Sequence, residues 1–291
     1  MSAFEWQYTA YIFVAAFVAY AWDWLLSISE EYKVVASAGI TSSNAIYFIS
    51  RLGAFGHLLL MVFNHLVPRH DCAVVVGMLG ACSSVSVAST SLLFLLRLRA
   101  IYMRSRNITA VFCALWLVTM ALILQAYASL KALHVPQTEY CLEKTVTSFT
   151  AASLAVFFYD TLIFLAITYR LAADAVPERN WRSCLLSILK GQGLSRLSRA
   201  LMQSGQIYYL ATILVFIFNL IVIWSPFVPL SLGPGAHYIV FTIYNAFTNI
   251  MACRVFRGVA LGMMHFEESS LSTTVIDAAF QLQPLPSSRR R

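Results

Sequence analysis

Long apolar stretches separated by short polar segments form the main pattern of this chain. A membrane-crossing helix needs about 20 predominantly apolar residues, and windows of that length find seven such stretches. They lie near 8–28, 44–66, 72–96, 108–130, 147–169, 205–226 and 236–256. The pattern predicts an all-α membrane protein, with a seven-transmembrane helix bundle over 1–262 and a polar, disordered cytoplasmic tail over 263–291.

The composition excludes a soluble fold. Hydrophobic residues make up 59% of the chain and charged residues 11%, and the mean hydropathy is +0.72. A soluble domain carries about 25% charged residues, and a soluble fold of the present composition would expose large apolar patches. The lipid bilayer is therefore the expected surrounding, and we expect a multi-pass protein of the plasma membrane or an endomembrane.

The orientation follows from the Lys and Arg residues, which concentrate in the cytoplasmic segments of membrane proteins. With the N-terminus outside and the C-terminus in the cytoplasm, 16 of them face the cytoplasm, three face outward and Arg51 lies within a span. Basic cytoplasmic loops near anionic lipid account for the net charge of +7. Nucleic acid is therefore not an expected partner.

Two of the six cysteines, Cys72 and Cys141, fall on the predicted outer side, which is the oxidising side. Cys72 begins the third predicted helix, and Cys141 lies in the loop between the fourth and the fifth. We expect a disulfide that ties this loop to the third helix. The alternative is two unpaired thiols.

Two charged residues lie inside predicted spans at a similar depth. Asp23 in the first helix and Arg51 in the second are both roughly 8–10 Å from the cytoplasmic edge, at about 1.5 Å per helical residue. A lone charge there is costly, so we expect an ion pair across two adjacent antiparallel helices. A structural pair that holds the helix register is favoured, and a switch or a proton site is the alternative.

A second polar group lies nearer the midplane and is a candidate polar cavity: His57, Asp160, Asn219, Asn245 and Asn249. Residues 77–91, GMLGACSSVSVASTS, add a run of small and polar side chains on the third helix. Small residues let helices approach closely. This run therefore indicates a central, tightly packed helix, with one wall of the cavity as the alternative.

Familiar catalytic and cofactor motifs do not occur in the sequence. The last predicted helix has no Lys for a retinal Schiff base, and there is no HExxH, P-loop, GxSxG or paired-cysteine motif. We therefore expect no enzyme activity, no cofactor and no metal site. The seven-span layout matches that of G-protein-coupled receptors, but the third helix ends in LLRLRAIYMRSR (95–106) without an acidic-arginine pair.

Several stretches of the chain carry a family resemblance. They are AWDWLLSISEEYKVV (21–35), YFISRLGAFGHLL (47–59), FFYDTLIFLAITYRL (157–171) and NIMACRVFRGVALG (249–262). In them the chain resembles a family of seven-helix membrane proteins of basidiomycete fungi, whose first two helices are catalogued as a domain of unknown function. The family often has Tyr-Asp in helix one and Asn-Arg-Tyr in helix two, where this chain has Trp22-Asp23 and Ser50-Arg51-Leu52. The resemblance implies a fungal seven-helix protein and supplies no activity.

The layout, the outer disulfide and the basic loops favour a receptor-like or sensory protein. It would signal through a cytoplasmic partner bound at the basic loops. A transporter or channel that uses the midplane polar residues is the alternative, and an intramembrane enzyme is the least favoured class. The sequence indicates no particular ligand.

Overall fold

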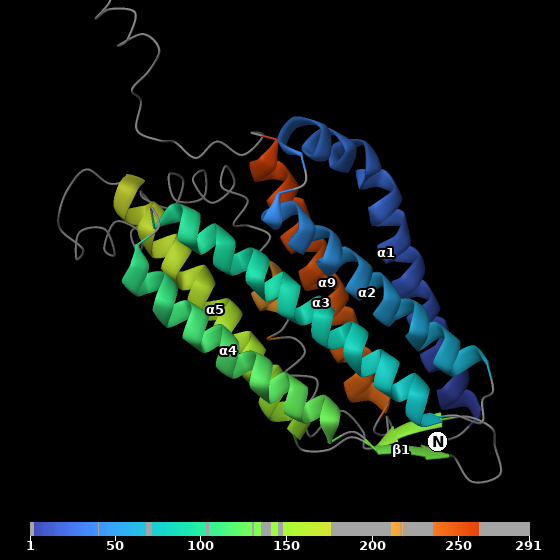
Figure 1. Cartoon of the computed structure of the whole chain (residues 1–291). Helices are drawn as coiled ribbons and strands as arrows, with labels where there is room; N and C mark the ends of the chain where they lie inside the picture. Colours follow the sequence, from blue (N-terminus) through green and yellow to red (C-terminus); the bar gives the residue numbers. More distant parts are fainter. Residues whose placement is uncertain are drawn as a thin grey trace, which may run out of the picture.

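The structure is a computed structural model that describes residues 3–39, 41–67, 72–102, 105–129, 131–134, 141–144, 148–175, 211–215, 217 and 235–261. Six long helices make up most of this part of the chain (Figure 1). They are α1 (Ala3–Ala38), α2 (Ser42–Leu66), α3 (Cys72–Ile101), α4 (Arg106–Ala128), α5 (Ser148–Ala175) and α9 (Gly235–Ala260). A small antiparallel hairpin of β1 (Lys131–His134) and β2 (Cys141–Lys144) joins α4 to α5, a feature that the sequence analysis did not foresee.

Five of the described helices, α1 to α5, are long and apolar enough to cross a membrane. The chain is therefore a multi-pass membrane protein, as its composition predicted. Helix α9 coincides with the predicted span at 236–256. It is more polar than α1 to α5, and its buried residues include Thr242, Thr248 and Asn249. Most of the predicted span at 205–226 lies outside the described residues.

Helix α1 is longer than predicted. It has 36 residues, about 54 Å of helix, and runs well past the end expected near residue 28. It stops at Gly39, whose φ of +67° favours glycine, and whose N–H donates to the carbonyl of Val35 at 2.9 Å. Thr41 then caps α2 by accepting from the N–H of Asn44 at 3.3 Å. The connection between the first two helices is a tight turn, and Figure 1 shows α1 curving toward it.

Helix α3 lies in the middle of the described bundle. It packs against α2, α4, α5 and α9, whereas α1 packs against α2 and α9. In Figure 1, α1 and α2 lie on one side of α3, α4 and α5 lie on the other, and α9 runs behind α2 and α3. Residues 77–91, the run of small and polar side chains, belong to this central helix.

Helices α2 and α3 approach each other closely. A Cβ atom at Gly53 would lie 3.0 Å from the backbone nitrogen of Ser86 and 3.2 Å from its Cα. No side chain fits there without moving the backbone of one helix. The same approach brings the hydroxyl oxygens of Ser50 and Thr90 to 3.0 Å.

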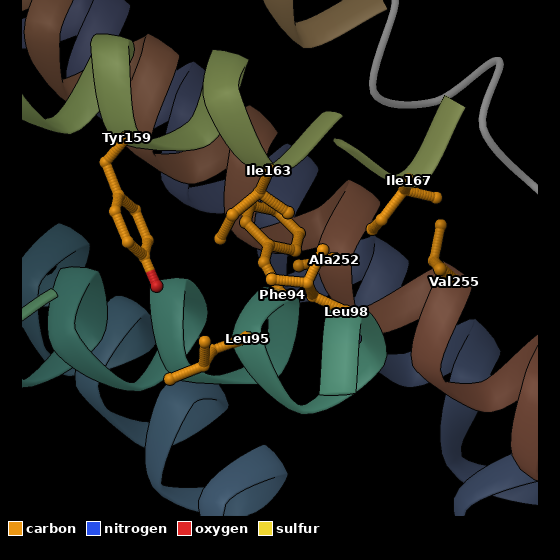
Figure 2. Packing of buried hydrophobic residues seen from close by; sticks show 8 residues of the cluster. All are labelled: Phe94, Leu95, Leu98, Tyr159, Ile163, Ile167, Ala252 and Val255. Carbon is orange, nitrogen blue, oxygen red and sulfur yellow. The ribbon is translucent and has the colours of Figure 1, made fainter. Parts of the chain in front are cut away.

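An apolar cluster joins α3, α5 and α9. Figure 2 shows its buried members: Phe94, Leu95, Leu98, Tyr159, Ile163, Ile167, Ala252 and Val255. Ile163 and Ile167 are four residues apart and therefore share one face of α5. These contacts hold one side of α9 against α3 and α5, and its other side faces α1 and α2.

Candidate functional site

Arg51 of α2 is the centre of a buried charge network. Its side chain is fully buried. Nη1 donates to Asp23 Oδ2 at 3.2 Å, and Nη2 donates to Ser27 Oγ at 2.9 Å. Nε lies 3.4 Å from Oε1 of Glu31. Because a buried charge is stable only when it is paired and hydrogen-bonded, these three α1 side chains allow Arg51 to lie inside the bundle.

Three aromatic rings also surround the guanidinium of Arg51. Its Cζ lies 5.7 Å from the ring centroid of Tyr20 and 5.9 Å from those of Trp24 and Tyr47. Aromatic faces attract cations at this distance, and the attraction grows when water is excluded. The rings therefore add to the carboxylates in compensating for the lost hydration of Arg51.

Two arginines of α9 extend the network. Arg254 donates from Nε and Nη2 to Asp23 Oδ1, at 3.0 and 2.7 Å. Arg257 donates from Nε to Glu30 Oε2 at 2.8 Å and from Nη1 to the hydroxyl of Tyr47 at 2.9 Å. The end of α9 is thereby fastened to the end of α1 and the beginning of α2.

The hydroxyl of Tyr47 joins the cations and one carboxylate. It donates to Glu31 Oε1 at 2.6 Å and accepts from Arg51 Nε at 3.3 Å and Arg257 Nη1 at 2.9 Å. A phenol has one donor and two acceptor positions, so all three are used. Glu31 also accepts from the Trp24 indole at 3.1 Å.

The charges of the network balance. The cations are Arg51, Arg254 and Arg257, and the anions are Asp23, Glu30 and Glu31. The rim is partly exposed, because the side chains of Arg254 and Glu30 are 44% and 41% exposed, whereas Arg51 is completely buried. The network thus has a dry centre and an edge that another molecule can reach.

A neutral polar layer lies beside the charges and brings in α3. Asn249 of α9 accepts from the hydroxyl of Tyr20 at 2.7 Å. Its Nδ2 donates to Ser50 Oγ at 2.6 Å and to Thr90 Oγ1 at 2.8 Å. One fully buried amide therefore links α1, α2, α3 and α9.

The structure brings the expected pair Asp23 and Arg51 into contact, but the network around it was not foreseen. The apolar stretch predicted that the first helix ends near residue 28, which left Glu30 and Glu31 outside it. The spacing held a usable signal, because Asp23, Ser27 and Glu31 recur every four residues and share one helix face. Extending the helix by one turn would have added Glu31 to the face that carries Asp23 and Ser27.

The five residues of the predicted polar cavity have different surroundings. Asn249 belongs to the network, and Asn219 lies outside the described residues. His57 is buried, with Nδ1 3.4 Å from a backbone carbonyl of α3. Asp160 and Asn245 are buried on α5 and α9. A cavity that all five share stays a prediction.

Cys72, at the start of α3, is disulfide-bonded. Cys82, Cys113 and Cys253 are free thiols. The hairpin carries Cys141 opposite His134, and its first strand lies against α3. The side chain of Cys141 lies outside what the structure describes, so its pairing with Cys72 stays a prediction.

The described side chains include no group of three or more His, Cys, Asp and Glu residues that could hold a metal ion. The acidic groups of the network face guanidiniums, which occupy the positions that a cation would take.

Comparison with known proteins gives one finding for this region. Residues 11–56 match a family of unknown function, DUF6533. The matched segment covers α1 from Tyr11 onward, the turn and the first half of α2, so it contains Asp23, Glu31, Tyr47 and Arg51. No curated protein matches the chain. The similarity therefore coincides with the α1 and α2 half of the charge network.

Proposed function

We propose that the chain is a seven-span receptor-like or sensory protein, with its N-terminus outside and its C-terminus in the cytoplasm, that signals through its basic cytoplasmic segments. The charge network is the observation that carries this proposal. It lies where α1 ends, α2 begins and α9 ends, which is the side of the bundle that the Lys and Arg distribution assigns to the cytoplasm.

A network of this kind can act as a conformational switch between helices. Ion pairs between helices have discrete made and broken arrangements, and repacked interface ion pairs accompany many switching transitions. Arg254 and Arg257 hold α9 to α1, so breaking both pairs would loosen the inner end of α9. The half-exposed side chains of Arg254 and Glu30 give a cytoplasmic partner groups for which it can compete.

The similarity to DUF6533 covers residues 11–56, which include the α1 and α2 side chains of the charge network. The wider likeness to seven-helix proteins of basidiomycete fungi is part of the proposal. A transporter or channel is the second candidate, and the buried carboxyl of Asp160 favours it. An intramembrane enzyme has no described constellation in its favour.

Cys253 supplies a reporter for the test. Its thiol is fully buried, 3.7 Å from Oδ1 of Asn249. A variant with Cys82, Cys113 and Cys184 replaced by Ala retains Cys253 and the cysteines of the predicted outer side. In vesicles of one orientation, labelling of Cys253 by a permeant maleimide should be slow, because the reagent must wait for the network to open.

Defined amino acids, sugars, peptides and sterols are then added outside these vesicles. If the protein is a receptor, an active compound should change the labelling rate of Cys253, and the change should saturate with concentration. The compound itself should stay outside the vesicles. Accumulation of that compound inside vesicles, only when the protein is present, would contradict the receptor and favour the transporter.

The proposed orientation has its own test. An Asn-X-Thr sequon inserted between β1 and β2 should be glycosylated, and one inserted at 170–204 should not. The reverse result would invert the bundle and remove the network from the cytoplasmic side.

A further inference from the structure

Asp160 is a buried acidic residue on α5 that the charge network does not include. It lies twelve residues after Ser148, about 18 Å along the helix, and so near the middle of a hydrocarbon layer about 30 Å thick. Only 8% of the residue is exposed. An acidic side chain at this depth marks a functional position in a membrane bundle by default.

No described group compensates for a charge on Asp160. Its Oδ1 is buried without a hydrogen-bond partner. None of the ion pairs found among the described residues includes it. Asp23 has the opposite surroundings, since it accepts from two guanidiniums. An ionised carboxylate is therefore stable at Asp23 and has nothing to stabilise it at Asp160.

The titratable groups around Asp160 are neutral ones. Tyr159 precedes it on α5, and Tyr244 on α9 lies within electrostatic reach of it. On α4, Cys113 lies within reach of Tyr159. The phenol of Tyr159 points toward α3 in Figure 2. None of the ion pairs between described residues joins Asp160 to a charged side chain of α3, α4 or α9.

We propose that Asp160 is a proton-binding site of the bundle. Its carboxyl group carries a proton while α3, α5 and α9 are packed together, and it releases the proton when water reaches it. The ligand is the proton itself, and opening of the bundle beside α5 would be coupled to proton release. This site is distinct from the charge network and does not depend on the receptor assignment.

The test compares one substitution at two carboxyl groups. Asp160→Asn replaces a protonated carboxyl by a neutral group of the same shape, whereas Asp23→Asn removes a charge from between two arginines. We expect Asp160→Asn to be as stable as the wild type at pH 5 in lipid nanodiscs. Asp23→Asn should lower the thermal midpoint throughout the range from pH 5 to 9.

The pH dependence has a definite sign. Above about pH 4 the unfolded chain has lost the proton of this residue, and the folded wild type still holds it. Folded protein then binds more protons than unfolded protein, so its stability falls as the pH rises. The wild-type midpoint should fall relative to Asp160→Asn by about 3 °C per pH unit until the folded form also loses its proton.

Two results would overturn the site. The first is a loss in Asp160→Asn at pH 7 that matches the loss in Asp23→Asn, since it means that a negative charge is needed there. The second is parallel pH profiles of wild type and Asp160→Asn.

Infrared spectroscopy gives a readout that is independent of stability. The wild type should show the C=O stretch of a protonated carboxyl group at neutral pH, and Asp160→Asn should lack it. If the Asn variant does not fold, Asp160→Glu assigns the band by shifting it. A wild-type spectrum without such a band would exclude the proposal.

Discussion

Asp23 and Asp160 are both buried acids, yet they stand in opposite surroundings. Asp23 lies between Arg51 and Arg254, in a region where described donors and acceptors are matched. Asp160 lies near an apolar cluster and has an unpartnered oxygen. The same side chain is thus a charged structural element at one end of the bundle and an uncompensated carboxyl near its middle.

Helix α9 takes part in both regions. One side of it contributes Ala252 and Val255 to the apolar cluster with α3 and α5. The other contributes Asn249, Arg254 and Arg257 to the polar contacts with α1 and α2. Ion pairs between helices have discrete made and broken arrangements. The proposed conformational role therefore concerns the polar side of α9, and the proposed proton site concerns its packing beside α5.

The largest effect should come from Arg51→Leu. It leaves Glu31 without its guanidinium and removes one of the two from Asp23, inside a buried site. Breaking a buried pair from one side costs about 3–5 kcal/mol. We expect most of the protein to be lost from the membrane fraction, as measured by fluorescence-detected size exclusion of a tagged chain. Arg99→Gln, at an exposed arginine of α3, is the control and should be neutral.

The charge swap Asp23→Arg with Arg51→Asp sharpens this result. An isolated pair would be restored by the swap. In the network the new arginine would face Arg254, and the new aspartate would face Glu31. The double variant should therefore be no better than Arg51→Leu. Recovery to near the wild-type level would mean that the pair acts alone, in contradiction to the network.

The sequence could predict the pair but not the assembly around it. The depths of Asp23 and Arg51 indicated that they meet, because an unpaired charge in a span is costly. Arg254 and Arg257 were counted as basic cytoplasmic residues, since a count of charges assumes that each faces water. Their partners on α1 are more than 200 positions away, and only the packing of α9 brings them together.

The secondary-structure elements also fall into those that the sequence predicted and those that it did not. Hydrophobic stretches predicted α2 to within two residues, because a span of fixed thickness limits an apolar helix at both ends. They misplaced the end of α1, because its last turns leave the apolar stretch and continue with buried polar side chains. The hairpin carries no strong alternation in its eight residues, so periodicity could not reveal it.

A smaller loss is expected from Asn249→Ala. This change leaves Ser50, Thr90 and the hydroxyl of Tyr20 with fewer buried partners. An unsatisfied buried polar group costs about 1–3 kcal/mol, so the thermal midpoint should fall by several degrees. The triple variant Asn249→Ala, Ser50→Ala, Thr90→Val removes two of these three groups and should regain part of the loss. A further fall in the triple variant would refute the account of this layer.

Tyr47→Phe should cost somewhat less, about 1–2 kcal/mol, because it removes one hydroxyl and keeps the ring over Arg51. Glu31, Arg51 and Arg257 each lose one hydrogen bond but retain a charged partner. Steric-trap measurements of unfolding free energy would give this value. A loss as large as that of Arg51→Leu would show that the phenol, and not the ion pairs, holds the network.

The smallest effect on stability and the clearest one on motion should come from Arg254→Gln. The Arg254 side chain is nearly half exposed, so its pair is worth less than about 1 kcal/mol. Asp23 keeps Arg51 as a partner, and the folded yield should be unchanged. The substitution nevertheless removes one of the two arginine attachments between α9 and α1, so the buried thiol of Cys253 should be labelled faster, by up to about fivefold for 1 kcal/mol. Labelling at the wild-type rate, with Arg257 still paired to Glu30, would mean that Arg254 takes no part in holding the inner end closed. The charge network would then be a purely structural set of contacts centred on Arg51, in contradiction to the conformational role proposed for it.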